Sequence, residues 1–143
     1  MSAIIRCPFL KTKTVRYCSL FRLTGEECYN RPMDFDEYQE LAARTGFYNQ
    51  DNREYILMYL CMGLAGESGE VIEKIKKIIR NDKGVISDEK RELLKKEIGD
   101  VLWYSSQLAR ALDLSFGEIA TTNITKLADR TARGVIKSEG DTR

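Results

Sequence analysis

The chain has 143 residues, of which 43% are hydrophobic and 31% are charged, and its net charge is +1. This length suits one domain with a hydrophobic core, and the composition is that of a folded, water-soluble protein rather than a disordered one. No apolar run approaches the roughly 18 residues of a membrane span, and the low net charge gives no reason to expect nucleic acid or a membrane as partner. A cytoplasmic location is therefore expected.

Charge is distributed unevenly along the chain. Residues 1–32 contain six Lys or Arg and two acids, whereas residues 33–143 contain 17 bases and 20 acids. The change coincides with Pro32 and predicts a boundary between a basic leader, residues 1–32, and a folded domain, residues 33–143. A solvated tail is the expected state of the leader, with contact to nucleic acid as the alternative.

The residue types exclude several kinds of site. Because the chain has no histidine, His-based triads, His general bases and most zinc enzymes are ruled out. Three of the four cysteines, Cys7, Cys18 and Cys28, lie in the leader, and Cys61 lies in an apolar helical stretch. None forms a CxxC motif, so free thiols are expected, with a metal or redox site in the leader as the alternative.

Two helices are predicted in the first half of the domain. Asp34, followed by Glu37, resembles a capping box, and apolar residues continue at helical spacing until Gly46. Asp51 offers a second start, after which apolar residues recur until the stop signal at residues 81–84. The second helix is therefore expected to be long.

Two further helices are predicted in the second half. Ser87 and Ser115 are the predicted N-caps, and the fourth helix is expected to end near Gly134. No segment shows the two-residue alternation of a strand. The sequence thus predicts an all-α domain built as a four-helix bundle.

Acidic residues interrupt the apolar stripes of the second and third helices. Glu67 stands in line with apolar side chains, Glu70 follows three residues later, and Glu97 and Asp100 repeat the arrangement. Four carboxylates that face a common core repel one another unless protons or cations neutralise them. Oxygen ligands without His or Cys favour Mg²⁺, with Mn²⁺ as a substitute. The alternative is that the acids are solvated on the helix surface.

Glycines surround these acids. Gly63, Gly66, Gly69 and Gly99 each cost about 1 kcal/mol relative to alanine inside a helix. Their missing side chains would leave space either for a ligand or for a closely packed neighbouring helix.

Several side chains could bind a nucleotide. Those that could contact phosphate share a face of the fourth helix or continue the face of Glu67 on the second: Asn123, Lys126, Arg130, Lys74 and Lys77. Each base taken singly could also be an ordinary surface charge. Trp103 and Tyr104 follow Asp100 and could stack on a nucleotide base, with core packing as the alternative.

The segments GLAGESGEV, KKEIGDVLWY and NITKLADRTARGVI resemble the MazG-like members of the all-α nucleoside triphosphate pyrophosphohydrolases. The resemblance extends from about Phe35 to the C-terminus. It implies hydrolysis of an NTP or dNTP to the monophosphate and pyrophosphate. The Mg²⁺ ligands that it implies are Glu67, Glu70, Glu97 and Asp100.

The same resemblance implies roles outside the metal ligands. Asn123, Lys126 and Arg130 would contact the phosphates or sugar of the nucleotide, and the protein would be a homodimer or homotetramer. Glu67 or Glu70 would accept the proton of the attacking water. Gly66 stands where many family members carry an additional acid.

Two other functions stay open at this point. The chain could be a non-catalytic helical interaction module, or it could hydrolyse another pyrophosphate-containing metabolite, such as a phosphoribosyl nucleotide. Nothing in the sequence signals a preferred base or sugar.

Overall fold

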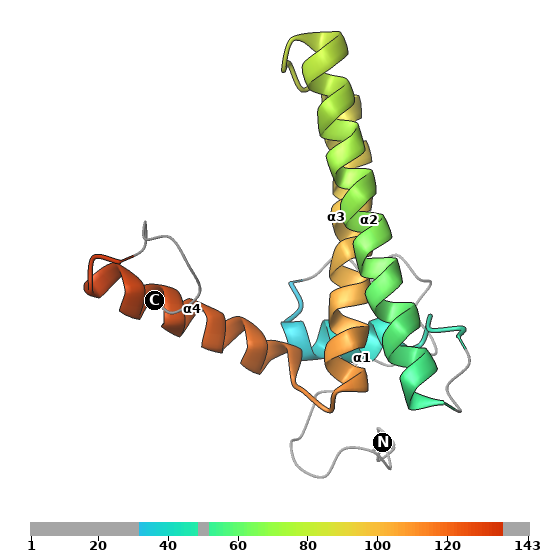
Figure 1. Ribbon diagram of the computed structural model, residues 1–143, viewed down its shortest axis with the longest axis vertical. Helices are drawn as coiled ribbons and strands as arrows, with labels where there is room; N and C mark the ends of the chain where they lie inside the picture. The colour runs from blue at the N-terminus through green and yellow to red at the C-terminus, as the bar shows by residue number, and fades with distance from the viewer. Residues whose placement is uncertain (1–31, 49–51, 136–143) are drawn as a thin grey trace, which may run out of the picture. The chain divides into compact units, whose positions relative to one another are not determined.

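The computed structural model describes residues 32–48 and 52–135. These residues form four helices and no strand: α1 (Phe35–Ala43), α2 (Arg53–Asp82), α3 (Asp88–Ala111) and α4 (Phe116–Ala132) (Figure 1). The predicted all-α fold is therefore confirmed. By its internal contacts the chain divides into the units Met1–Pro32 and Met33–Arg143. The predictions for the leader and for Cys7, Cys18 and Cys28 fall outside the described residues.

The starts of the helices follow the capping signals. Three predicted N-caps are confirmed, because each side chain accepts the backbone N–H three residues ahead: Asp34, Ser87 and Ser115. The predicted start of α2 is wrong by one residue. Its N-cap is Asn52, which accepts from the backbone N–H of Tyr55 at 3.1 Å, whereas Asp51 lies outside the described residues. Asparagine and aspartate cap equally well, so residue type alone does not separate two adjacent candidates.

The ends of the helices lie close to the predicted stops. Helix α1 ends at Ala43, three residues before Gly46. Helix α2 ends where Lys83 and Gly84 adopt left-handed backbone angles, with φ of 54° and 83°, which is a common way for a helix to terminate. Helix α4 ends two residues before Gly134, whose φ is 69°.

Helices α2 and α3 form an antiparallel hairpin, joined by residues 83–87 (Figure 1). At 1.5 Å per residue, α2 is about 45 Å long. One ion pair, between Lys90 and Asp82, joins the two helices near the connection. At the other end of the hairpin Arg53, at the start of α2, pairs with Asp113 in the turn after α3, with N–O 3.4 Å. Among the described residues, α4 packs against α1 and α3 and makes no comparable contact with α2.

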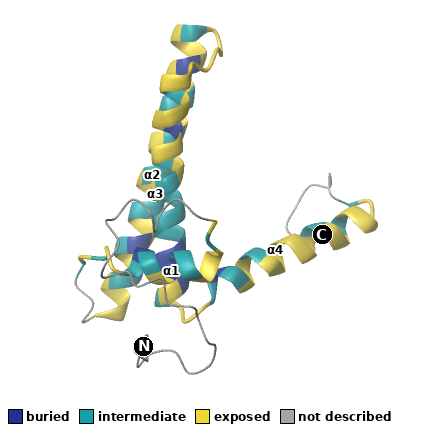
Figure 2. Ribbon diagram, turned by 180° about the vertical axis from the view of Figure 1, so that it is seen from behind, coloured by how far each residue is buried: buried dark blue, intermediate teal, exposed yellow. Residues whose placement is uncertain are grey.

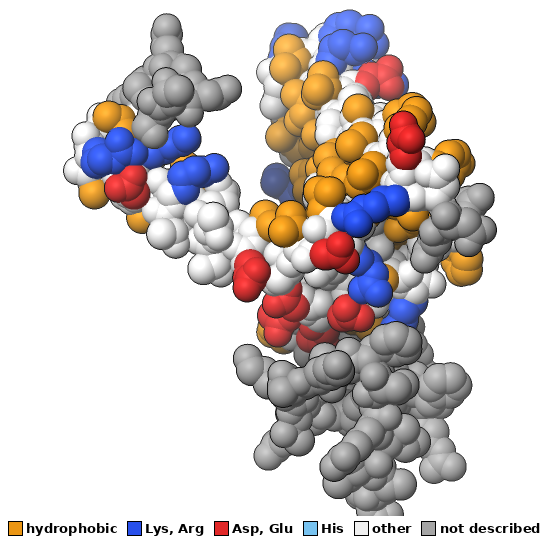
Figure 3. All heavy atoms as spheres, turned by 60° about the horizontal axis from the view of Figure 1, so that its bottom comes forward, with side chains coloured by type: hydrophobic (Ala, Val, Ile, Leu, Met, Phe, Trp, Pro, Cys, Tyr) orange, Lys and Arg blue, Asp and Glu red, His pale blue; other side chains and the backbone are white. Residues whose placement is uncertain are grey.

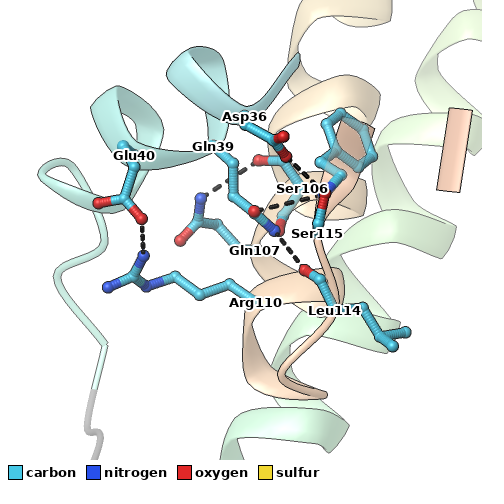
Figure 4. A network of polar contacts seen from close by, with 9 residues as sticks. Asp36, Gln39, Glu40, Ser106, Gln107, Arg110, Leu114 and Ser115 are labelled. Atoms are coloured by element: carbon cyan, nitrogen blue, oxygen red, sulfur yellow. Dashed lines mark hydrogen bonds and ion pairs between the residues drawn. The ribbon is translucent and has the colours of Figure 1, made fainter. Parts of the chain in front are cut away.

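A buried polar network holds α1, α3 and the start of α4 together (Figure 4). The amide Nε2 of Gln39 donates to the backbone oxygens of Ser106 and Leu114, each at 3.1 Å. Its Oε1 accepts the N–H of Phe116 at 3.4 Å. Gln39 is only 7% exposed and Ser106 is fully buried, so these bonds replace water that the backbone groups cannot reach.

Many large apolar side chains stay exposed on the described helices (Figure 2). Met62, Ile72 and Ile79 on α2 are more than 60% exposed, as is Ile124 on α4. Figure 3 shows hydrophobic side chains gathered on the face of the hairpin that is turned to the viewer. None of the described helices combines the length and the apolar character needed to cross a membrane.

Candidate metal centre

The α2–α3 hairpin brings three acids together. Glu67 and Glu70 lie one turn apart on α2, and Glu97 faces them from α3. One carboxylate oxygen from each lies within 4.8 Å of the other two. Glu67 and Glu97 are partly buried and Glu70 is exposed. Three hard oxygen donors at this spacing suit a divalent cation such as Mg²⁺.

Asp100 lies at the edge of this acidic triad. It follows Glu97 by one turn of α3 and is exposed, and it is not one of the three acids with mutually close oxygens. It is still near enough to contribute to the raised pKa of Glu67. The burial expected for both acidic pairs is therefore partial, because Glu67 and Glu97 are partly buried whereas Glu70 and Asp100 are exposed.

The surroundings of Glu67 raise the pKa of its carboxyl group. Partial burial raises its pKa above the usual value, and the negative charges of the three neighbouring acids raise it further: Asp100, Glu70 and Glu97. Among the described residues no base forms an ion pair with Glu67. A cation bound between these acids would relieve the repulsion, so the residues present fit a divalent metal.

Lys74 and Lys77 lie in different environments. The ammonium Nζ of Lys74 reaches across the hairpin to Oε1 of Glu97 at 2.9 Å, and this hydrogen bond raises the pKa of Lys74. Lys77 instead pairs with Glu73 on its own helix at 3.3 Å and is half exposed. Of these two candidate phosphate ligands, only Lys74 contacts the acidic triad.

Trp103 is tied to α1 rather than presented to a ligand. Its indole N–H donates to Oγ1 of Thr45 at 2.8 Å and lies 3.3 Å from the backbone oxygen of Ala42. Its ring also meets Tyr104 edge to face, with centroids 4.9 Å apart. These contacts favour the packing role over stacking on a nucleotide base.

The glycines beside the acids divide into two kinds. A Cβ at Gly63 would lie only 2.1 Å from Cε1 of Tyr104, so Gly63 permits this ring to pack against α2. A Cβ at Gly66, Gly69 or Gly99 would meet nothing within 4 Å. Packing within the described chain therefore explains Gly63 and does not explain the other three.

Two tyrosines lie near the acids: Tyr104, which the sequence offered as a stacking residue, and Tyr38, which it did not single out. The pKa of Tyr104 is raised, first by burial and then by neighbours that include Tyr59, Glu67 and Asp100. Tyr38 on α1 also has a raised pKa, because of burial and the charge of Asp100. The position of Tyr104 one turn after Asp100 is visible in the sequence, whereas the position of Tyr38 depends on how α1 packs.

The structure does not bring the α4 candidates to the acids of the same chain. Asn123 and Lys126 are exposed on α4, and this helix does not pack on α2. Arg130 is partly buried, and its Nε atom has no hydrogen-bond partner among the described residues. The grouping of these residues on one helix is as predicted, but their approach to the triad is not seen within one chain.

Residues 58–134 match the family model of the MazG nucleotide pyrophosphohydrolase domain. The chain belongs to this family. The MazG match covers the four candidate metal ligands on α2 and α3 together with the candidate residues of α4, and it leaves out α1. The chain is also 44% identical over 115 residues to the Gene 37 protein of Mycobacterium phage L5, an alignment that covers 78% of this chain and 100% of that protein. No solved structure matches the chain significantly.

Proposed function

We propose that this MazG-family protein is a Mg²⁺-dependent pyrophosphohydrolase that cleaves an NTP or dNTP to the monophosphate and pyrophosphate. The observation that carries the proposal is the approach of Glu67, Glu70 and Glu97 to within 4.8 Å of one another, inside the region that matches the family. Asp100 is the proposed fourth ligand, because it lies one turn from Glu97 and interacts electrostatically with Glu67.

The acids and Lys74 have different proposed roles in the reaction. Mg²⁺, or Mn²⁺ in its place, would neutralise phosphate charge and make water a better nucleophile. Glu67, which lies partly buried beside the other acids, is one candidate for accepting the proton of the attacking water. Exposed Glu70 serves as a ligand and alternative base. Lys74, next to the triad, is placed to bind a phosphate oxygen.

A second copy of the chain is proposed to complete the site. The large exposed apolar side chains of α2 and α4 are typical of a surface that another subunit covers. Asn123, Lys126 and Arg130 are proposed to bind the nucleotide in such an assembly. Light scattering during size-exclusion chromatography should therefore give the mass of a dimer or tetramer, and a monomer would contradict this part of the proposal.

The activity is tested with a panel of nucleotides, Mg²⁺ and identification of both products. Release of pyrophosphate and a monophosphate from at least one NTP or dNTP is expected, and the panel includes a phosphoribosyl nucleotide to test the alternative substrate class. Release of orthophosphate alone, or no turnover at all, would refute the proposal.

A matched pair of variants tests the acidic triad. Glu97→Gln should abolish turnover and Mg²⁺ binding. It should not stabilise the fold, because Lys74 loses its partner. Glu73→Gln is the control, since Glu73 is half exposed on the same hairpin and pairs with Lys76 and Lys77 of its own helix. Full activity in Glu97→Gln would show that the triad is not the metal site.

A further inference from the structure

Lys74 is paired differently from the other lysines of α2. Its ammonium lies 2.9 Å from Oε1 of Glu97, so this ion pair joins two helices. The side chains of Lys74 and Glu97 are 29% and 14% exposed, whereas Lys76 and Lys77 are more than half exposed and pair with Glu73 on their own helix. Lys74 is thus held between the helices, beside the acids.

The partner of Lys74 is also a member of the acidic triad. An oxygen of Glu97 lies within 4.8 Å of oxygens from Glu67 and Glu70, so the carboxylate that would bind a divalent cation already faces an ammonium. Two cations on one carboxylate repel each other strongly at such short distances. The flexible four-carbon stem of lysine allows Lys74 to move away, whereas the side chain of Glu97 is shorter and more buried, at 14% exposed.

We infer that Lys74 is an internal counter-ion of the acidic triad. In the metal-free protein its ammonium pairs with Glu97, and a divalent cation that binds the triad displaces it. The displaced ammonium is then free to bind a phosphate of the substrate. This inference rests on the proposed function, because it requires that the acids bind a cation.

Displacement of Lys74 couples the two ligands of the site. A phosphate that binds the ammonium of Lys74 also frees Glu97, and a cation that binds Glu97 frees Lys74. Each ligand therefore favours the other, as thermodynamic linkage requires. The ion pair keeps affinity for cations low until a phosphate ligand is present.

The test measures Mn²⁺ binding to the full-length protein by calorimetry, without any nucleotide. Lys74→Met removes the competing ammonium and should tighten Mn²⁺ binding by about tenfold, within the usual range of coupling between sites. Lys74→Arg keeps the charge and should stay close to wild type. Lys76→Met is the matched control, because it removes a positive charge from the same helix without touching the triad, and it should change the affinity less than about twofold.

Thermal unfolding supplies a readout that does not depend on activity. Without metal, Lys74→Met leaves Glu97 unpaired beside two other acids, so its Tm should be lower than that of the wild type. Saturating Mn²⁺ should close this gap, because the cation replaces the lost ammonium. Lys76→Met should follow the wild type in both conditions. Lys74→Gln is measured in parallel, so that the inference can be tested if the methionine variant does not fold.

The outcomes separate this inference from the proposed function. If the wild type binds Mn²⁺ but neither Lys74→Met nor Lys74→Gln binds it more tightly, the counter-ion role is wrong and the metal site stands. Equal tightening in Lys76→Met would also overturn the role, since it would reflect only the general loss of positive charge. A wild-type protein that binds no Mn²⁺ would refute the metal site itself.

Discussion

Replacing Gly63 by alanine should destabilise the protein, although alanine is the better helix former. The added Cβ would lie 2.1, 2.4 and 2.6 Å from three carbons of the Tyr104 ring, whereas carbon atoms in contact are normally about 3.5–4.0 Å apart. The ring must therefore move by more than about 1 Å. Its movement is restricted by Trp103, 4.9 Å away between ring centroids, and by Tyr59 at 6.3 Å.

The expected loss follows from two opposing contributions. Alanine gains about 1 kcal/mol over glycine in a helix interior. Overpacking typically costs about 1–3 kcal/mol, and the severity of this overlap places Gly63→Ala at the upper end. The net loss is about 2 kcal/mol, which urea denaturation without metal should report as a midpoint lower by about 1 M.

Two further variants control for the cause of this loss. Gly66→Ala on the same helix meets no atom within 4 Å and should gain about 1 kcal/mol. In a Tyr104→Ala background, Gly63→Ala should no longer destabilise, because the obstructing ring is gone. The reasoning would be refuted if Gly63→Ala were as stable as the wild type, or if its cost persisted without the ring.

Three further substitutions should change stability in ways that denaturation can measure. Gln39→Leu removes the partner of three backbone groups and should cost about 2–4 kcal/mol; a loss below about 1 kcal/mol would contradict the network's role. Asp36→Ala removes bonds from Oγ of Ser115 and N–H of Gly117 and should cost about 1–2 kcal/mol at neutral pH. These bonds lower the pKa of Asp36 below 3.8. The carboxylate of Asp36 therefore stabilises the fold above pH 3.8, and this stabilisation disappears as the pH falls through the lowered pKa. A stability loss in Asp36→Ala that did not depend on pH would contradict this reasoning. Without metal, Glu67→Gln should be more stable than the wild type at pH 7 by up to about 0.5 kcal/mol. The pKa of Glu67 is raised in the folded protein, so the wild type loses stability as the pH rises from 4.5 through this raised pKa, whereas glutamine does not ionise. The stability difference between Glu67→Gln and the wild type should vanish below pH 4.5. A variant less stable than the wild type at pH 7 would show that the charge of Glu67 does not destabilise the fold.

Local features of this fold could be predicted from the sequence because they depend on neighbours along the helix. Ser87 and Ser115 act as N-caps through backbone groups three residues away, and Glu67 lies in the helical register of a partly buried stripe. The approach of Glu97 to Glu67 was also predictable, since a short connection makes consecutive helices antiparallel neighbours.

Features that depend on contacts distant in sequence could not be predicted in the same way. The bond from Gln39 to Ser106 joins positions 67 residues apart, and the conflict between Gly63 and Tyr104 depends on how deeply one ring enters the hairpin. Lys74 was expected to face a phosphate, but helical spacing does not reveal that its nearest partner is Glu97. The positions of Asn123 and Lys126 depend on how α4 leaves the hairpin, which α1 and α3 determine.

The Gln39 network extends the packed structure beyond the region that matches the family model. The family match begins at residue 58, yet Gln39 and Asp36, which hold the first turn of α4, precede it. A chain shortened to the matched residues would keep every acid of the triad. It would keep α4, the helix that carries Asn123, Lys126 and Arg130, but lose the contacts from α1 that hold the first turn of this helix.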